Sequence, residues 1–518
     1  MSLTCSDLIK RGEALYGRQP AILFEGRTFT FAEQATRMYR LANALHSLGV
    51  RKQERVAILS WNRSEYVEVF GAGEVGGFIT VNLNSRLALK ELAAICQDCQ
   101  PSVLIYAKDF AASAQEIAAQ VGSIRHIISL DDTESSLHYE SMLEQARAEA
   151  PATDVCPSDI AYIMYTSGTT GGAKGVMISH AAMAKATAML SHECGVISTD
   201  KALIVMPLFH LGGKIEQMNF SLMGAQVVLK SGFEPSDVAE TIQRERVTAA
   251  HFAPLMVQRL LDEVEAKPYD LSSLRCVHYA SAPMPVPLLR RAIARMGPIF
   301  AQVYGMTECI GCTVLKAHNH LLDGSAEQRR QLASAGQPLL GNAVRIVRSD
   351  GSTCDEGEIG EIVIRSPTVM SGYWNKSTLT SEVLRDGWMF TQDLGMVDRD
   401  GYVYVMDRKK DMIISGGENI YSWEVEEALR DHPDVAEVAV IAVPDKVWGE
   451  SVKACVQLRP GRAADAAALI EHTRQQIASY KKPKSIDFVE ALPRLFNGKI
   501  DKKALRAPYW ANHDRQVS

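Results

Sequence analysis

The first hydrophobic pattern along the chain is that of a short strand followed by an amphipathic helix. Residues 27–30 alternate as a strand does, and Thr30 with Glu33 forms the capping box that begins many helices. Apolar residues then recur at helical spacing, at Ala35, Met38, Leu41, Ala42, Leu45 and Leu48. Because Gly49 ends this run, the pattern predicts one strand–helix unit.

The same rhythm recurs through most of the chain. Short apolar runs with the length of a buried strand stand at residues 56–59, 203–206, 227–229, 276–279 and 299–304, with helical patterns between them. Strands that alternate with helices are typical of α/β folds. The predicted fold class is therefore α/β, with a large N-terminal body of α/β subdomains.

Two changes of pattern follow. Beyond Glu356, a strand at residues 357–365 and turn signals at 386–387, 400–401 and 416–417 predict a β-rich subdomain. A helix at residues 423–431, a strand at 438–443 and a helix at 464–479 then restart an independent pattern. These last elements predict a small α+β C-terminal domain.

Composition narrows the classes of function. The 518 residues include 55 basic and 61 acidic side chains, a net charge of −6, which argues against a nucleic-acid or anionic-membrane binder. No apolar run approaches the roughly 18 residues of a membrane-spanning helix. Asp7, Lys10 and Arg11 stand where a signal peptide would be apolar. We therefore expect a cytoplasmic protein without a membrane span, whose partners are small molecules.

The ten cysteines include two pairs with the spacing of metal ligands, Cys96 with Cys99 and Cys309 with Cys312. The pairs lie about 200 residues apart, and neither is followed by the short return spacing of a zinc ribbon. Since free cysteine is commonly a small buried residue, the pattern favours core thiols over zinc.

Residues 165–175 carry the clearest chemical signal. They offer glycines from Gly168 onward, the charge of Lys174, and hydroxyl groups at Thr166, Ser167, Thr169 and Thr170. Hydroxyl and backbone donors that converge on one point suit a polyanion, so this stretch predicts a phosphate-binding loop with ATP as its ligand.

This loop differs from the nucleotide-binding motif of strand–loop–helix NTPases. Counted from Gly168, that motif requires a glycine where Ala173 stands and a serine or threonine where Gly175 stands. A flexible turn rich in glycine and threonine is the alternative interpretation. Strand-like segments at 160–165 and 176–178 hold both ends, which favours a binding loop.

Seven segments in order resemble the adenylate-forming superfamily of acyl-CoA synthetases, adenylation domains and beetle luciferase. They are the loop at 165–175 and the stretches at 207–210, 304–308, 392–393, 407–411, 415–420 and 493–500, which together cover nearly the whole chain. This chain departs from the family pattern at Ala173, where proline is usual, and at Gln392, where glycine is common. We expect neither departure to change the chemistry.

The resemblance implies an N-terminal adenylate- and acyl-binding domain at residues 1–409 and a mobile C-terminal lid at 410–518, with a hinge at Lys410. It implies an AMP-forming acyl-CoA synthetase that uses ATP, Mg2+ and coenzyme A. A carboxylic acid first displaces pyrophosphate to form an acyl-adenylate, and the thiol of coenzyme A then displaces AMP. The lid is expected to swing between the two steps.

The first reaction brings two anions together, so it needs positioning and positive charge. By the resemblance, Lys499 bridges the carboxylate and the α-phosphate, whereas we expect solvated side chains at Lys481, Lys482, Lys484, Lys502 and Lys503. A charge at ~4 Å is worth about 4 kcal/mol at an effective dielectric of roughly 20. Loss of Lys499 should therefore cost a large factor in rate.

The resemblance assigns the remaining polar groups of the nucleotide site. Glu308 would bind Mg2+ and Thr307 the α-phosphate, with a Thr-Glu helix start as the structural alternative. Asp393 and Arg408 would hold the ribose hydroxyls.

Small residues complete the implied site. Ser281, Ala282 and Pro283 would line the adenine, on which Tyr304 would stack. After the lid has moved, Gly416 and Gly417 would line a channel for the pantetheine arm, where absent side chains leave room.

The nature of the acid is less defined. Equivalent segments line the acyl pocket in relatives, which makes candidates of His210, Gly212, Gly213, Lys214, Phe252, Pro254, Met256, His278, Ala280, Gly305 and Cys309. His210 is expected to gate carboxylate entry. An enzyme that activates amino acids would carry an aspartate near this point to bind the ammonium group of its substrate, and this chain has none beside His210. An aromatic or short-to-medium aliphatic acid is therefore favoured. Lys214 would either pair with a second carboxylate or a keto oxygen of the acid, or face solvent, and solvent is favoured.

Three functions remain open at this point. The first is a carboxylate–CoA ligase, and the second is a ligase that loads a carrier protein or another acceptor. The third is a nucleotide sensor without catalysis, which the retention of Lys499, Glu308, Asp393 and Arg408 disfavours. The oligomeric state, including a homodimer, also stays open.

Overall fold

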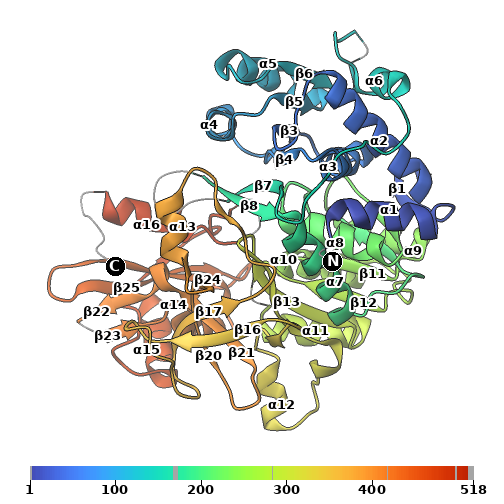
Figure 1. The fold of residues 1–518 in the computed structure, drawn as a ribbon. Coiled ribbons are helices and arrows are strands. Elements are labelled where there is room, and N and C mark those ends of the chain that lie inside the picture. Colours follow the sequence, from blue (N-terminus) through green and yellow to red (C-terminus); the bar gives the residue numbers. More distant parts are fainter. Residues whose placement is uncertain are drawn as a thin grey trace. The chain divides into compact units, whose positions relative to one another are not determined.

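The computed structural model describes residues 3–132, 134–166, 173–282, 284–416, 418–495 and 499–511. The chain divides into two compact units, one of Met1–Ala343 with Arg365–Met389 and the other of Val344–Ile364 with Phe390–Ser518. Figure 1 shows helices and sheets in both, so the predicted α/β class with a β-rich part and a small C-terminal domain is confirmed. The domain boundary proposed at Lys410 falls inside the second unit.

A seven-stranded sheet lies in the first unit. Its order is β18 (Gly372–Tyr373), β8 (Lys174–Ser179), β7 (Ile160–Thr166), β4 (Ile79–Asn82), β3 (Arg55–Leu59), β5 (Val103–Tyr106) and β6 (His126–Ser129). The strands from β7 to β6 are parallel, whereas β7, β8 and β18 pair antiparallel.

Helices cover both faces of this sheet. Val56 and Ile58 of β3 pack with α2 (Phe31–Ser47) and α3 (Ser64–Gly76), while Ala57 and Leu59 point to the other face. That face packs on α4 (Leu89–Cys99) and α5 (Ala111–Gln120). Burial on both sides explains why the strand at 56–59 reads as a continuous apolar run rather than an alternating one.

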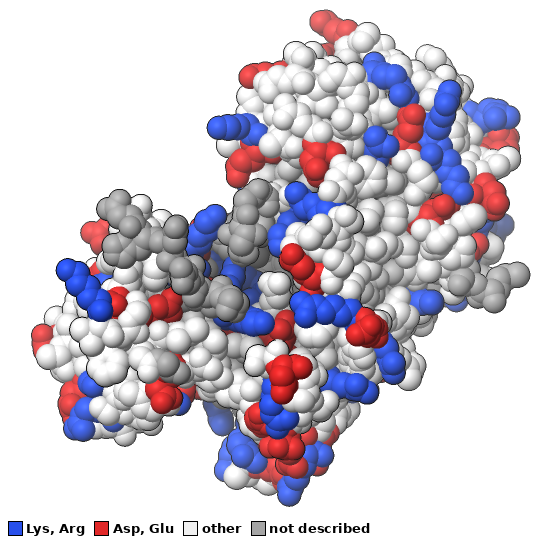
Figure 2. All heavy atoms as spheres, turned by 60° about the vertical axis from the view of Figure 1, so that its left-hand side comes forward, with Lys and Arg blue, Asp and Glu red and all other residues white. Residues whose placement is uncertain are grey.

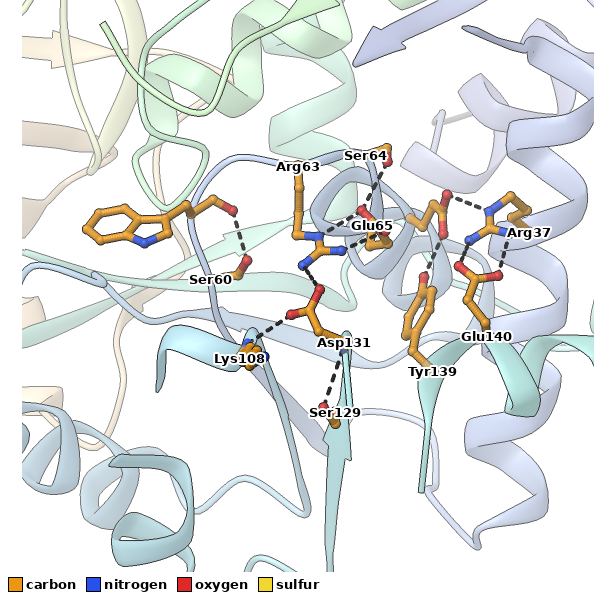
Figure 3. Close-up of polar contacts among 12 residues, drawn as sticks. Arg37, Ser60, Arg63, Ser64, Glu65, Lys108, Ser129, Asp131, Tyr139 and Glu140 are labelled. Atoms are coloured by element: carbon orange, nitrogen blue, oxygen red, sulfur yellow. Dashed lines mark hydrogen bonds and ion pairs between the residues drawn. The ribbon is translucent and has the colours of Figure 1, made fainter. Parts of the chain in front are cut away.

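Ion pairs fasten the helices at one edge of this sheet (Figure 3). Arg37 of α2 bonds Glu68 of α3 at 2.7 Å and also pairs with Glu140 of α6 (Tyr139–Gln145). Nearby, Arg63 Nη1 contacts Asp131 Oδ1 at 2.8 Å. These side chains come from segments far apart in the sequence, so they fix the N-terminal subdomain.

A nine-stranded sheet forms the rest of the core of the first unit. Its order is β15 (Gln337–Pro338), β14 (Cys309–Leu315), β13 (Phe300–Met306), β12 (Cys276–Tyr279), β11 (Ala249–Phe252), β9 (Lys201–Ile204), β10 (Gln226–Leu229), β1 (Pro20–Phe24) and β2 (Arg27–Thr30). The strands from β1 to β13 are parallel, and the outer pairs are antiparallel.

This sheet is also covered on both faces. One face packs on α7 (His180–Glu193) and α8 (Leu211–Leu222), and the other on α9 (Pro235–Glu245), α10 (Pro254–Ala266) and α11 (Val286–Met296). The remaining helices of this unit are α1 (Cys5–Tyr16), α12 (Ala326–Gln331), α13 (Ser377–Val383), η1 (Lys108–Phe110) and η2 (Ala317–Asn319).

The parallel strands decide where chemistry can gather. The carboxyl ends of parallel strands lie at one edge of a sheet, and ligands of α/β proteins bind at such edges. His210 follows β9, Ser281 follows β12 and Thr307 follows β13. The sheet therefore places these predicted site residues along the same edge.

The strands of the second unit belong to two smaller sheets, of which the first also includes β19 from the range assigned to the first unit. One contains β16 (Ala343–Val347), β17 (Gly360–Arg365), β20 (Trp388–Val397), β19 (Leu384–Arg385) and β21 (Val403–Arg408). The other contains β23 (Glu418–Ile420), β22 (Ile413–Ser415), β25 (Gly449–Leu458), β24 (Val435–Asp445) and β26 (Ser485–Phe488). The helices are η3 (Lys409–Asp411), α14 (Ser422–Arg430), α15 (Ala466–Gln476) and α16 (Lys502–Trp510).

Local predictions agree with these elements. Thr30 is the N-cap of α2, and its capping box with Glu33 is present. The strand predicted at 203–206 instead covers Lys201–Ile204, because Val205 and Met206 are buried outside the ladder. Cys96, Cys99, Cys309 and Cys312 are all buried thiols, as the core interpretation predicted.

None of the helices in the described ranges combines the length and the apolar character that a bilayer crossing requires. On the face drawn in Figure 2, basic and acidic side chains of the described residues are interspersed.

Candidate active site

The predicted phosphate-binding loop joins two antiparallel strands. Four of its predicted ligands lie outside the described residues, namely Ser167, Gly168, Thr169 and Thr170. Its ends, Thr166 and Lys174, are cross-strand partners of β7 and β8. The adjacent Tyr165 hydroxyl donates a 2.5 Å hydrogen bond to Asp98 Oδ2. The loop is therefore carried by a hairpin that is fixed to the body of the first unit.

An aromatic ring links this hairpin to the predicted magnesium ligand. Tyr373 of β18 pairs with Val176 of β8. The Lys174 ammonium lies 5.4 Å from the centroid of the Tyr373 ring, and the Tyr373 hydroxyl donates a 2.9 Å hydrogen bond to Glu308 Oε1. The lysine of the loop and the carboxylate thus meet at one side chain.

Thr307 and Glu308 form the tip of a hairpin. Met306 pairs with Cys309 across β13 and β14, so the two residues between them make the turn. The helix start considered as an alternative is therefore wrong. Gly305 is required here, because a side chain would come within 2.9 Å of the Gly311 nitrogen.

The donor set at this tip fits Mg2+. Glu308 supplies a carboxylate, a hard oxygen ligand, and Tyr373 orients it by a hydrogen bond. The ion would bind here together with phosphate oxygens held by the loop.

The segment predicted to line the adenine shows backbone strain at Ser281. Ser281 has φ = +76°, a left-handed conformation that non-glycine residues rarely adopt. Ala282 follows it, and Pro283 lies outside the described residues. Tyr279, the last residue of β12, pairs with Gln302 of β13. The segment that follows β12 and Tyr304 of β13 therefore lie at the same edge of the sheet. Such strain is typical of positions shaped for a ligand.

His210 begins α8 as its N-cap residue. Burial, and then the charge of Arg86, lower the pKa of His210 to about 3. Its imidazole is therefore neutral at neutral pH.

The acyl-pocket candidates lie at the starts of helices, on strands or directly after strands. Gly212, Gly213 and Lys214 lie in the first turn of α8, and Gly305 lies on β13. Pro254 and Met256 begin α10, Ala280 follows β12, and Phe252, His278 and Cys309 are buried.

Lys214 does not face solvent, so that prediction is wrong. Its ammonium lies 2.8 Å from Glu74 Oε1, and both side chains are 3% exposed. It also lies 4.5 Å from the centroid of the Phe70 ring. The carboxylate of α3 compensates the buried charge, which the local sequence around Lys214 does not reveal.

The predicted ribose ligands contact each other in the second unit. Asp393 of β20 and Arg408 of β21 are cross-strand partners, with Arg408 Nε 2.6 Å from Asp393 Oδ1. The preceding Gln392 has φ = +61°, a conformation that glycine adopts without strain. This explains why glycine is common there, and the carboxylate remains in place.

Lys499 shares the electrostatic environment of this pair. Burial, and then repulsion by Arg408, lower the pKa of Lys499 to about 8, while Asp393 acts in the opposite direction. Lys410 of η3 lowers it further. The charges of Asp393, Arg408 and Lys410 therefore all act on the ammonium group of Lys499.

Two neighbouring lysines differ from the prediction of solvated side chains. Lys502 lies 2.7 Å from Glu426, and Lys481 lies 2.7 Å from Glu424. Both carboxylates belong to α14, so these lysines hold that helix in place.

Two features of the backbone at residue 416 favour glycine. Its φ is +61°, and a side chain there would come within 2.4 Å of the Trp448 ring. Its nitrogen donates a 2.9 Å hydrogen bond to the Trp448 carbonyl. Gly417 lies outside the described residues.

The structure brings the predicted residues together in two groups, one in each unit. Lys174 and Glu308 meet in the first, and Asp393, Arg408 and Lys499 in the second. Sequence reasoning missed Tyr373, which contacts both members of the first group. Its only local signal is the aromatic Gly372-Tyr373-Trp374 stretch, which reads equally well as a core strand.

A ligase that activates its substrate with a nucleotide is the class these features define, and comparison with known proteins agrees. The family model described as AMP-binding enzyme matches residues 10–374, and the model for the AMP-binding enzyme C-terminal domain matches residues 424–499. The chain belongs to this family of AMP-binding, adenylate-forming enzymes.

Similar proteins span the same length. Feruloyl-CoA synthase from an Amycolatopsis species is 38% identical over 487 residues, which cover 94% of this chain and 95% of that protein. Indoleacetate–CoA ligase of Aromatoleum aromaticum is 36% identical and covers 97% of each. ATP-bound MatB from Rhodopseudomonas palustris has a TM-score of 0.89 at 29% identity, covering 98% of this chain and 99% of that one. The predicted AMP-forming acid–thiol ligase class is confirmed.

Proposed function

We propose that this protein joins an aromatic carboxylic acid to coenzyme A in two steps, with an acyl-adenylate as the intermediate. The proposal rests on two groups, one within each unit, Lys174–Tyr373–Glu308 and Asp393–Arg408–Lys499, each with the chemistry that one part of a magnesium nucleotide requires. Two similar proteins are named as ligases of feruloyl and indoleacetate substrates, which supports an aromatic acid.

The residues divide the work of adenylation. A carboxylate is a poor acyl donor, and attack on the α-phosphate of ATP replaces its poor leaving group with AMP. Glu308 would hold Mg2+, which would neutralise charge on the phosphates. Lys174 and Thr166 face the phosphates, Thr307 bonds the α-phosphate, and Asp393 with Arg408 fixes the ribose.

Lys499 belongs to the C-terminal part of the chain, and its role is to carry positive charge to the reacting atoms. A cation between carboxylate and α-phosphate offsets the repulsion of two anions, and it stabilises the charge that develops in the transition state. His210, which is neutral, orients the incoming carboxylate.

Thioester formation uses another surface. We propose that residues 410–518 swing about Lys410, which withdraws Lys499 and brings Gly416 and Gly417 beside the pantetheine arm. Ten free thiols support a reducing compartment, and we place the enzyme in the cytoplasm.

The test is acid-dependent exchange of pyrophosphate into ATP with a panel of aromatic and short-to-medium aliphatic acids. We expect exchange with at least one aromatic acid, and no exchange without acid. AMP release is then compared with coenzyme A and with an acyl-carrier protein as acceptor. Faster release with the carrier protein would favour the alternative, a carrier-loading ligase.

A further inference from the structure

A chain of hydrogen bonds connects the two sides of the proposed pivot at Lys410. On one side lies Asp407 of β21, next to the predicted ribose ligand Arg408. On the other side lie Ser422, the first residue of α14, and Lys502, the first residue of α16. All of these residues belong to the second unit, so their contacts lie within one compact part of the chain.

Asp407 caps the N-terminus of α14 from outside that helix. Its Oδ2 atom accepts hydrogen bonds from the backbone nitrogen and from the hydroxyl of Ser422, both at 2.7 Å. The first N–H groups of a helix have no acceptor within the helix, and the positive end of the helix dipole attracts a carboxylate. The first turn of α14 is therefore stabilised by a residue from before the pivot.

Lys502 extends this chain of hydrogen bonds toward Lys499. Its ammonium donates a 2.5 Å hydrogen bond to Ser422 Oγ and lies 2.7 Å from Glu426 Oε1. The Ser422 hydroxyl thus donates to Asp407 and accepts from Lys502, which a hydroxyl can do at the same time. Ser422 is fully buried, and both of these hydrogen bonds have a charged partner, which makes them stronger than neutral ones.

The segment that carries Lys499 is fixed to the start of α16. Lys499 stands three residues before Lys502, and its carbonyl accepts a 2.7 Å hydrogen bond from the Leu495 nitrogen. The Asp501 nitrogen donates at 2.8 Å to the Pro493 carbonyl. Because these bonds join the two ends of the segment, the position of Lys499 follows that of Lys502.

These contacts belong to the orientation that adenylation requires in our proposal, since Arg408 and Asp393 act on the charge of Lys499. A rotation about the pivot moves Ser422, twelve residues beyond it, relative to Asp407, three residues before it. Hydrogen bonds of 2.7 Å are lost when their atoms move apart by about 1 Å. The swing therefore breaks the contact between Asp407 and Ser422.

We propose that Asp407, Ser422 and Lys502 are positioning residues for adenylation and form a latch across the pivot. The latch holds Lys499 beside Asp393 and Arg408 during the first step, and it opens before thioester formation. This inference rests on the proposed function and on the swing of residues 410–518.

The latch opens without leaving a buried cation uncompensated. Glu426 lies on the same side of the pivot as Lys502, so their ion pair is kept during the rotation. Asp407 keeps the 2.8 Å hydrogen bond from the Arg408 nitrogen, because both residues belong to β21. The bonds between Asp407 and Ser422 are exchanged for bonds to water, which makes the cost of opening modest.

The experiment measures two rates for each variant: pyrophosphate exchange, and thioester formation from a supplied acyl-adenylate. Asp407→Ala removes both bonds across the pivot, so kcat for exchange should fall about 10- to 100-fold. Thioester formation should stay at the normal rate or rise, since that step needs the latch open. Asp407→Asn keeps an acceptor oxygen and Ser422→Ala keeps the backbone bond, so each should retain part of the exchange.

A cap that does not cross the pivot provides the matched control. Asp465 is the N-cap residue of α15, and its carboxylate accepts from the Ala468 nitrogen at 3.2 Å. Both residues lie beyond Lys410. Asp465→Ala should therefore lower stability in urea unfolding, but it should leave the ratio of the two rates unchanged.

The outcomes separate the two proposals. If Asp407→Ala changes both rates equally or neither of them, or if Asp465→Ala changes their ratio to the same extent, the inference fails and the proposed function stands. If the unmodified enzyme exchanges pyrophosphate with no acid, the proposed function itself fails. Should Asp407→Ala not fold, the same ratio in Asp407→Asn and Ser422→Ala decides.

Discussion

In our proposal the ammonium group of Lys499 is the charge that bridges the carboxylate and the α-phosphate during adenylation. Its pKa of about 8 lies close to physiological pH because burial and the neighbouring cations disfavour the charged form. Only the protonated lysine attracts two anions. The value of kcat/KM for pyrophosphate exchange should therefore fall as the pH rises through about 8, as measured in a series of buffers. Lys499→Arg stays protonated, so its residual exchange should lack this decline.

Removal of the amine separates the two half-reactions. Lys499→Ala should abolish acid-dependent pyrophosphate release but still form thioester from a supplied acyl-adenylate, since that step does not need the bridging charge. Product formation is measured for each half-reaction in the same preparation. Equal loss of both would contradict the assigned role.

In our proposal Tyr373 positions Glu308, the predicted magnesium ligand. Tyr373→Phe removes the 2.9 Å hydrogen bond to Glu308 and keeps the ring beside Lys174. Outer-shell partners of metal ligands contribute about 10-fold or more to metal affinity, so the Mg2+ concentration for half-maximal exchange should rise by roughly that factor. An unchanged Mg2+ titration with reduced kcat would place the effect elsewhere.

Residue types in motifs were predictable, and their partners were not. The sequence indicated Asp393 and Arg408 because a motif carries them, and they are cross-strand partners. Lys214 was misjudged because its compensating carboxylate, Glu74, lies on another helix 140 positions away in the sequence. A lysine beside two glycines gives no local sign of burial.

At the scale of elements, α8 is unusual because it buries charge on two faces. Glu216 faces His278 of the sheet, and Lys214 faces Glu74 of α3. Breaking one partner of a buried pair leaves an uncompensated charge, which costs about 3–5 kcal/mol. Glu74→Leu should therefore lower the free energy of unfolding of the first unit by roughly that amount.

The double variant distinguishes charge from packing. Glu74→Leu combined with Lys214→Met removes both charges, so it should be more stable than Glu74→Leu alone in urea unfolding. Additive losses in this cycle would mean that the pair itself contributes little.

Elements were predicted well where their signals are local. The capping box at Thr30 marks the start of α2, and the apolar run at 276–279 coincides with β12. The strand predicted at 203–206 lies two residues earlier in the structure. An apolar run indicates burial, whereas a strand also needs a hydrogen-bond partner for its backbone groups. Val205 is buried without belonging to the ladder.

At the scale of the whole molecule, the sequence indicated a β-rich part but not the unit to which it belongs. Residues 344–364 join the second unit because β17 pairs with β20 across a long intervening segment. Such pairing depends on register between distant strands, which hydrophobic alternation alone does not specify.

The proposed swing of residues 410–518 makes the last prediction. Lys410 lies in η3 between β21 and β22, and Asp411 beside it is held by Arg506 at 2.6 Å, so rotation must be absorbed by very few backbone angles. Lys410→Pro fixes φ near −65° and should keep pyrophosphate exchange while it slows thioester formation by about 100-fold, because only the second step needs the rotated state. Lys410→Ala is the control, since it removes the charge and leaves the backbone free. If both variants ligate coenzyme A at the normal rate, the pivot lies elsewhere; if both lose exchange, the ammonium group rather than the rotation is what the first step requires.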